Sequence, residues 1–190
     1  GSIVTCDLFF PQAMNGWKPK QMVVVLADMW SRYSNAFAVE RKNYENIKKA
    51  MLKFFRNLGR LGVTPRRCLN DKGTDLAPIK LIMESFRLKK DGDKPMVLNS
   101  RTGMPASYIE SLNSEYQRRT QVFATAGITN DISTVLPDIM DQLNNQKIPA
   151  KSGFTPNELI RMSDNEVRFV NRNYIRSEID IEPLKRMDTV

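Results

Sequence analysis

The first forty residues carry the hydrophobic pattern of three β-strands. Residues 3–10 form an apolar, β-branched run that is interrupted by a single acid, Asp7. Residues 21–28 are almost continuously apolar, which is typical of a strand buried on both faces. Residues 33–40 follow after a short link, and Asn15-Gly16 is a hairpin-turn signal between the first two runs. Three strands with short connections predict an antiparallel meander.

The hydrophobic period changes to that of a helix between residues 44 and 61. Asn43 is a candidate N-cap for this helix, and Gly62 is a candidate stop. The polar side of the helix is basic and includes Lys49 and Lys53. Such a stripe is more often a solvated face than a phosphate-binding one, and both interpretations stay open.

Short strands and helices alternate in the rest of the chain. Strands are expected at 67–70 and 96–99, and helices at 77–86, 105–124, 131–146 and a short segment capped by Thr155. Pro137 is an alternative start for the helix at 131–146. Beyond Ser163 the chain is polar and unpatterned, so residues 163–190 are expected to form a tail or linker.

This order predicts one mixed α/β domain over residues 3–162, with a sheet that is part meander and part parallel, flanked by helices. The chain has 190 residues, enough to bury one core. No apolar stretch approaches the roughly 20 residues of a membrane span. Gly1-Ser2 resembles the remnant of a cleaved purification tag.

Composition restricts the chemistry. The chain has two cysteines and no histidine, which excludes a Cys/His zinc site and histidine-based catalysis. Sparse cysteines are typical of an intracellular protein. The formal charge of +8 favours a polyanionic partner such as nucleic acid.

Three acids are candidate metal ligands, and each has an ordinary structural explanation. Asp7 lies inside an apolar strand, where an unpaired carboxylate is costly, but it can also pair with an arginine or point to solvent. Asp71 follows the fourth strand, where α/β folds place functional residues, but aspartate is also common in turns. Glu110 begins a largely uncharged stripe that continues through Gln117 and Gln121, although solvent exposure is the default.

As a set, these acids fit a site for two divalent cations. Two ions about 4 Å apart, suited to in-line phosphoryl transfer, need bridging and flanking carboxylates. Mg²⁺ takes hard oxygen ligands and keeps several waters, so three acids can suffice. Asp7 and Asp71 can meet Glu110 if the first and fourth strands are neighbours.

The order of these motifs resembles the catalytic core of the retroviral-integrase superfamily, which includes retrotransposon and Polinton-type integrases and related transposases. The stretches that carry the resemblance are 5–8 (Thr-Cys-Asp-Leu), 24–33 (Val-Val-Leu-Ala-Asp-Met-Trp-Ser-Arg-Tyr), 69–75 (Leu-Asn-Asp-Lys-Gly-Thr-Asp), 108–113 (Tyr-Ile-Glu-Ser-Leu-Asn), 143–145 (Leu-Asn-Asn) and 153–158 (Gly-Phe-Thr-Pro-Asn-Glu). The likeness covers about residues 3–161.

The resemblance implies a ribonuclease H-like fold with a mixed five-stranded sheet. It also implies that Asp7, Asp71 and Glu110 are the catalytic and metal-binding triad, holding two Mg²⁺ or Mn²⁺ ions, and that Asp28 and Asp75 have structural or supporting roles. The implied function is that of a DDE-type polynucleotidyl transferase, with 3′-end processing and strand transfer of element DNA into target DNA. The implied setting is a homodimer or larger assembly on DNA, in the nucleus or in a viral or mobile-element nucleoprotein complex.

The chain departs from the family pattern beside the second and third acids. Lys72 stands where Asn is frequent, and Ser114 stands where retroviral members often have a lysine that contacts terminal DNA. Gln117, Arg118 and Lys72 are possible substitutes, and Asn113, Ser114, Lys49 and Lys53 complete the set of expected DNA contacts.

Two other functions remain open at this point. One is a plain nuclease of the same fold, which cuts without joining. The other is a non-catalytic, domesticated core that binds nucleic acid or organises an assembly. The host element, the target preference, the oligomeric state and any flanking domains do not follow from the sequence.

Overall fold

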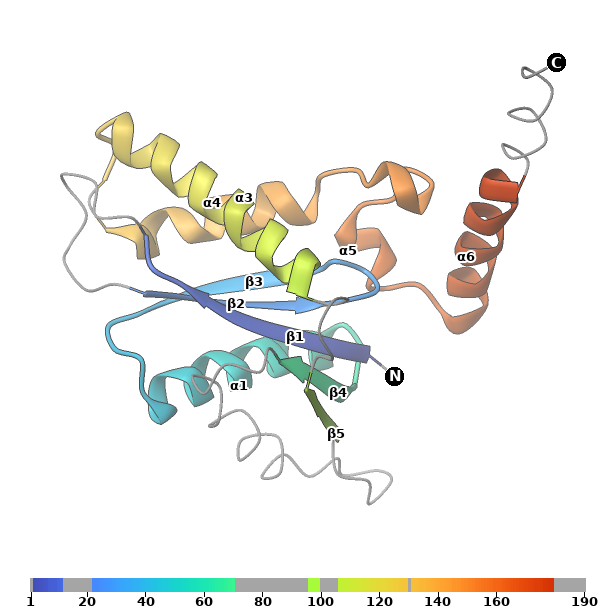
Figure 1. Cartoon of the computed structure of the whole chain (residues 1–190), viewed down its shortest axis with the longest axis horizontal. Helices are drawn as coiled ribbons and strands as arrows, with labels where there is room; N and C mark the ends of the chain where they lie inside the picture. The colour runs from blue at the N-terminus through green and yellow to red at the C-terminus, as the bar shows by residue number, and fades with distance from the viewer. Residues whose placement is uncertain (1, 12–21, 71–95, 100–105, 130, 180–190) are drawn as a thin grey trace, which may run out of the picture.

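The structure is a computed structural model that describes residues 2–11, 22–70, 96–99, 106–129 and 131–179 (Figure 1). Several predictions lie outside these residues: the Asn15-Gly16 turn, the helix at 77–86, and the placement of Asp71, Lys72, Asp75 and Pro105.

The described part of the chain contains a five-stranded mixed sheet in the order β3-β2-β1-β4-β5. The strands are β1 (Ser2–Phe9), β2 (Met22–Asp28), β3 (Ser34–Val39), β4 (Pro65–Asn70) and β5 (Met96–Asn99). Strands β1, β2 and β3 pair antiparallel, whereas β4 pairs parallel to β1 and β5 parallel to β4. The predicted five-stranded sheet, part meander and part parallel, is therefore confirmed.

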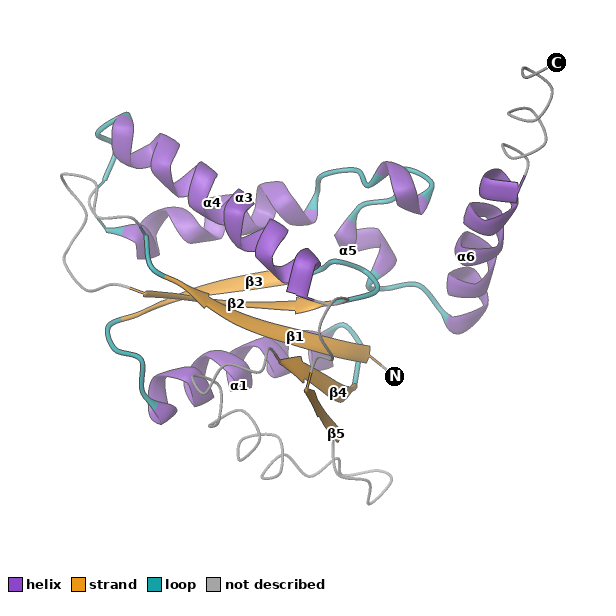
Figure 2. Cartoon of the chain, viewed as in Figure 1, coloured by secondary structure: helices purple, strands orange, loops and turns teal. Residues whose placement is uncertain are grey.

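Helices cover both faces of this sheet (Figures 1 and 2). One face packs against α1 (Tyr44–Arg60), and the other packs against α3 (Ala106–Thr125) and α4 (Ile132–Asn144). All seven side chains of β2 are buried, because this strand is covered on both faces. Its nearly continuous apolar run is explained by this double burial.

Side-chain alternation in β1 divides its residues between the two cores. Val4 and Cys6 pack in the cluster beneath α1, whereas Phe9 packs in the cluster beneath α3 and α4. Because successive side chains of a strand point to opposite faces, Asp7 shares the α3 side with Phe9. The acid of the first strand thus points toward the helix that carries Glu110.

The boundaries of the helices predicted at 44–61 and 131–146 agree with local capping chemistry. Asn43 caps α1 by accepting from Asn46 N, and Gly62 follows the helix with a φ of 76°. Asp131 caps α4. The alternative start of α4 at Pro137 is wrong, because the helix runs through this residue. Proline removes only the bond to the carbonyl of Ser133, which lies on an exposed turn that water can reach.

After α4, the described residues up to position 179 form three further helical segments. They are η2 (Pro149–Lys151), α5 (Pro156–Leu159) and α6 (Asp164–Ile179). Thr155 and Glu158 form a complete capping box at the start of α5, as the sequence predicted for the Thr155 cap.

Residues 164–179 form a helix, although the sequence beyond Ser163 shows no hydrophobic period. Ser163 N and Oγ both donate to the Glu166 carboxylate at 2.7 Å, which caps α6. Val170 is buried beside Leu159 and Ile148, and Trp30 Nε1 donates to Asn171 Oδ1 at 3.2 Å. Because single residues rather than a repeated apolar stripe make these contacts, the hydrophobic pattern of the sequence does not reveal them. Whether residues 163–190 link this domain to another stays a prediction.

No helix in the described part of the chain combines the length and the apolar character needed to cross a lipid bilayer.

Candidate active site

Asp7 lies near the end of β1 and is half-buried on the α3 side of the sheet. Its Oδ1 accepts from the backbone N–H of Leu8 at 2.8 Å. Its Oδ2 accepts from the side-chain amide of Asn113 at 2.6 Å. These two bonds fix the direction of the carboxylate and account for an acid inside an otherwise apolar strand.

Asn113 brings the helix that carries Glu110 onto β1. Asn113 is buried, whereas Glu110 is exposed, and the two are separated by three residues along α3. Residues at this spacing are neighbours on one face of a helix. Glu110 therefore lies one turn from the side chain that contacts Asp7, at the solvent end of the same stripe.

The paired part of β4 ends close to the position of the second acid. The parallel register pairs Thr5 with Leu69, and each of these residues precedes one predicted ligand by two positions. Asp7 follows Thr5 in β1, and Asp71 follows the last residue of β4, Asn70. The side chain of Asp71 lies outside the described residues.

The oxygen atoms that Asp7, Glu110 and Asn113 offer are ligands of the kind that a hard cation prefers. Asp7 and Glu110 offer carboxylate oxygens, and Asn113 Oδ1 is a buried oxygen with no hydrogen-bond partner among the described residues. Mg²⁺ and Mn²⁺ prefer such oxygen ligands. Within the described ranges no three Cys, Asp or Glu side chains form a metal-binding group. Asp71 lies outside those ranges, so only two of the three predicted ligands are among the described residues.

Asp28, the other acid in the resemblance that the structure describes, has a structural role. Its Oδ2 accepts from Ser31 N at 2.8 Å and from Ser31 Oγ at 2.6 Å. These bonds stabilise the turn between β2 and β3, in which Arg32 adopts a φ of 63°. The side chain is buried at the end of β2, three residues beyond Val25, the residue that pairs with Asp7.

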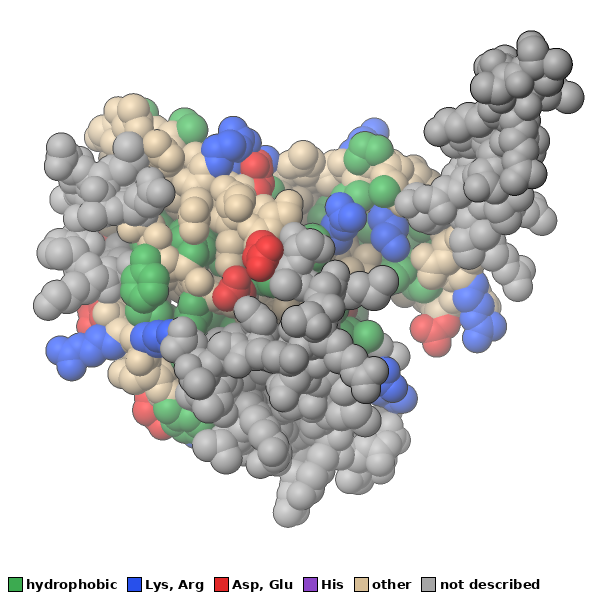
Figure 3. Space-filling model, in the orientation of Figure 1, with side chains coloured by type: hydrophobic (Ala, Val, Ile, Leu, Met, Phe, Trp, Pro, Cys, Tyr) green, Lys and Arg blue, Asp and Glu red, His purple; other side chains and the backbone are tan. Residues whose placement is uncertain are grey.

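The polar stripe of α3 contains further candidate DNA contacts. Gln117 is half-buried and Ser114 is exposed, and Ser114 Oγ donates to the backbone carbonyl of Glu110 at 2.9 Å. In Figure 3 acidic side chains lie next to each other near the middle of the visible face, and others lie at its margins.

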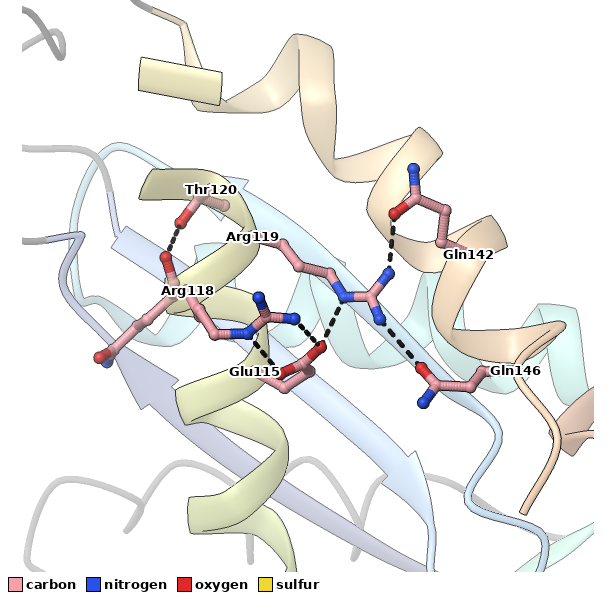
Figure 4. Close-up of polar contacts among 7 residues, drawn as sticks. Glu115, Arg118, Arg119, Thr120, Gln142 and Gln146 are labelled. Carbon is pink, nitrogen blue, oxygen red and sulfur yellow. Dashed lines mark hydrogen bonds and ion pairs between the residues drawn. The ribbon is translucent and has the colours of Figure 1, made fainter. Parts of the chain in front are cut away.

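The guanidinium of Arg118 is paired with Glu115, because its Nε and Nη2 donate to the two carboxylate oxygens (Figure 4). The same carboxylate accepts from Arg119 Nε at 2.7 Å, and Arg119 reaches α4 through Gln142 and Gln146. The hydrogen bond from Arg118 is the largest cause that lowers the pKa of Glu115, to about 2. The spacing of Glu115 and Arg119 by four residues is a signal that sequence analysis could have used.

Lys49 and Lys53 lie on the opposite side of the sheet from Asp7 and Glu110. Both lie exposed on α1, across the sheet from α3, and Lys53 Nζ lies 5.4 Å from the ring centroid of Phe37 in the edge strand β3. The sheet therefore separates these two lysines from the face on which Asp7 points.

Comparison with known proteins identifies the fold. No protein-family model matches the chain, and no curated protein matches it by sequence. A chain in the structure of the simian T-cell lymphotropic virus intasome in complex with PP2A regulatory subunit B56 gamma aligns with a TM-score of 0.67 and 14% identity, over 85% of this chain and 55% of that one. The catalytic core domain of BIV integrase aligns with a TM-score of 0.59 and 15% identity, over 83% of this chain and 92% of that domain.

The chain thus spans about half the length of the intasome chain and nearly all of the isolated BIV core domain. At these identities the likeness is one of fold. The predicted ribonuclease H-like architecture is confirmed, and the chain has the fold of a retroviral integrase catalytic core.

Proposed function

We propose that this chain is the catalytic core of a metal-dependent DNA integrase or transposase, which carries out 3′-end processing and strand transfer of element DNA into target DNA. The observation that carries the proposal is the hydrogen bond between Asn113 and Asp7. It holds the helix of Glu110 against the strand of Asp7, beside the strand that leads to Asp71. Asp7 and Glu110 thereby belong to neighbouring elements of a fold shared with integrase cores, and Asp71 follows the last residue of β4 in sequence.

Asp7, Asp71 and Glu110 would hold two Mg²⁺ or Mn²⁺ ions. When bound, such a pair activates the attacking oxygen and stabilises the leaving oxygen of a phosphodiester in line with it. The oxygen-only donor set and the unpartnered Asn113 Oδ1 support this assignment.

The chain's own groups would orient the reaction. Asn113 fixes the rotamer of Asp7, and Glu110 presents its carboxylate from the solvent side of α3, where a DNA strand can reach it. Lys72, Ser114 and Gln117 are the candidates for contacts with the DNA backbone, and Asn113 supports the ligand beneath them. Arg118 would contribute only by exchanging its bond with Glu115 for a phosphate.

The proposed partners are element ends and target DNA, bound by a homodimer or larger assembly. The positive formal charge of the chain supports a nucleic-acid partner. The proposed location is a nucleoprotein complex in the nucleus of a host cell.

The test is an oligonucleotide assay with Mn²⁺ or Mg²⁺, using blunt DNA for end processing and a pre-cut donor for strand transfer. Asp71→Asn should abolish both reactions and leave the fold and DNA binding intact. Asp138→Asn, at an exposed position on α4, is the matched control and should keep full activity.

Each failure of this assay has a distinct meaning. Cleavage without joining of the pre-cut donor would indicate a plain nuclease. DNA binding without metal-dependent cleavage would indicate a non-catalytic core. A crystal structure with Mn²⁺ in which any of the three carboxylates lies more than about 10 Å from the others would refute the shared metal site.

A further inference from the structure

The turn that joins β2 to β3 lies beside the N-terminal end of α3 (Figure 1). Asp28 N donates to Tyr33 O at 2.8 Å, and Arg32 N donates to Asp28 O at 2.9 Å. Together with the bonds from Ser31 to the Asp28 carboxylate, these contacts fix the backbone of residues 28–33. The turn belongs to a motif of the family resemblance, and the proposed function gives its arginine no role.

Arg32 has a backbone conformation that an L-amino acid rarely adopts. Its φ of 63° lies in the left-handed region, where a Cβ atom is strained and glycine is not. The residue is exposed, so burial does not account for the choice of arginine. A strained residue of this kind suggests a use for its side chain.

The side chain of Arg32 contacts Tyr108 at the start of α3. The guanidinium carbon lies 5.4 Å from the centroid of the Tyr108 ring, and the Tyr108 hydroxyl donates to the Arg32 carbonyl oxygen at 3.3 Å. Burial raises the pKa of Tyr108, so the phenol keeps its proton and remains a donor. A cation over an exposed aromatic ring changes an equilibrium by about two- to fivefold. We call these two contacts the Arg32–Tyr108 clamp.

The clamp lies next to Glu110 along α3. Tyr108 precedes Glu110 by two residues, and Asn113, which contacts Asp7, follows Glu110 by three. The first amides of a helix lack intrahelical acceptors, and helix ends are where local opening is easiest. Glu110 is the fifth residue of α3, close to this weak end. The clamp and the Asn113 bond therefore hold the helix on both sides of Glu110.

We propose that Arg32 and Tyr108 are positioning residues for Glu110: the clamp keeps the first turn of α3 folded against the β2–β3 turn, so that the Glu110 carboxylate stays in register with Asp7. The inference rests on the proposed function, because Glu110 is a metal ligand only there. Both residues act through the backbone of α3. The proposal also explains why an arginine, and not a glycine, occupies the left-handed position.

Hydrogen exchange of the metal-free protein tests the positioning itself. Arg32→Asn suits the left-handed backbone but lacks the cation, and it should raise the exchange rate at amides 110–112 about threefold. Tyr108→Leu removes the ring as well and should raise this rate about tenfold. Arg32→Lys keeps a cation over the ring and should stay within about 1.5-fold of the wild type. Unchanged exchange at 110–112, or an equal rise at amides 120–124 of the same helix, would overturn the proposal.

Mn²⁺ binding to the DNA-free protein is the second measurement, made from the EPR signal of the free ion. Arg32→Asn should weaken binding about threefold and Tyr108→Leu about tenfold, and Arg32→Lys should restore the wild-type affinity. Removal of a positive charge alone favours cation binding, so weaker binding by Arg32→Asn has no electrostatic explanation. Arg161→Asn, which removes an exposed charge from the α5–α6 link, is the matched control and should not weaken binding.

Urea unfolding separates positioning from general stability. Arg32→Asn should unfold at the same or a higher urea concentration than the wild type, because asparagine tolerates the left-handed backbone better. A loss of Mn²⁺ affinity that only follows a lowered midpoint would assign the clamp a merely structural role and overturn the proposal.

Glu110→Gln distinguishes the two ways in which the Mn²⁺ experiment can fail. If Glu110→Gln weakens Mn²⁺ binding but Arg32→Asn and Tyr108→Leu bind like the wild type, the positioning proposal alone is wrong. If the wild type and Glu110→Gln bind Mn²⁺ equally, or neither binds it, the proposed function fails, and the clamp has no metal ligand to position.

Discussion

Asn113 and Asp7 lie 106 residues apart in sequence, and the Asn113 amide donates to the Asp7 carboxylate over 2.6 Å. A bond this short from a neutral donor to an ionised acceptor is of the stronger, charge-assisted kind. The bond joins α3 to the central strand β1. These two elements carry the predicted ligands Glu110 and Asp7.

Replacing Asn113 tests this contact. Asn113→Ala should lower the free energy of unfolding by about 2 kcal/mol, because the bond to a charged acceptor is lost. Asn113→Asp keeps the shape but places a second carboxylate against Asp7, so in metal-free buffer it should be the less stable variant at neutral pH. Saturating Mn²⁺ should recover more stability in Asn113→Asp than in Asn113→Ala. Urea unfolding with and without Mn²⁺ measures both effects, and equal stability of the variants in metal-free buffer would contradict the contact.

Glu115 makes the interface of α3 and α4 sensitive to acid. Its pKa is lowered from 4.5 to about 2, first by the hydrogen bond from Arg118. A carboxyl group with a lowered folded-state pKa stabilises the fold above its unfolded pKa, and this contribution is lost as the pH falls from about 4.5 toward 2. Glu115→Gln should therefore lower the Tm at pH 7, and the gap to the wild type should close across that window. A gap that stays constant from pH 7 to pH 3 would argue against the ion pairs in Figure 4.

Asn144 should be a strong determinant of stability. Its buried amide makes two bonds to the backbone of Ser34, so Asn144→Ala leaves an unpaired N–H and C=O at the edge of β3. The expected loss is about 2–3 kcal/mol in chemical unfolding. Asn145→Ala is the neighbouring control: its exposed side chain bonds mainly within its own turn, to Asp141, and should cost under about 1 kcal/mol. Similar losses for the two variants would count against the closure of this edge by Asn144.

The packing of α6 can be measured through Trp30. Val170 is 2% exposed beside Leu159, whereas its neighbour Phe169 is 64% exposed. In a Trp17→Phe background, Val170→Asp should release α6 and shift Trp30 emission to longer wavelength, while unfolding of the sheet remains cooperative. Phe169→Asp should leave the emission unchanged. A shift in both variants, or in neither, would mean that Val170 is not the anchor of α6.

Sequence analysis succeeded where one physical cause governs a run of residues. Burial on both faces explains the continuous apolar pattern of β2, and local capping chemistry explains the start of α5 at Thr155. It failed for α6, because tertiary contacts of scattered residues such as Val170 and Trp30 hold that helix. Propensity and period carry little information about such contacts.

In the candidate site, too, local sequence predicted some features, whereas tertiary contacts decided others. The sequence predicted the polar stripe of α3. The hydrogen bond from Asn113 to Asp7, however, depends on how the helix crosses the sheet. Arg118 was expected to bind DNA, although its spacing of three residues from Glu115 already permits a pair within the helix. The placement of Lys49 and Lys53 across the sheet from the acids likewise depends on which face α1 covers.

Strand β1 pairs antiparallel to β2 and parallel to β4, so its register is fixed by neighbours of opposite direction. Deleting or inserting one residue between Val4 and Asp7 would turn the carboxylate from the α3 side into the apolar packing beneath α1, where Cys6 now lies. Natural variants of this protein can therefore change many side chains of β1. They can hardly change the number of residues between Val4 and Asp7.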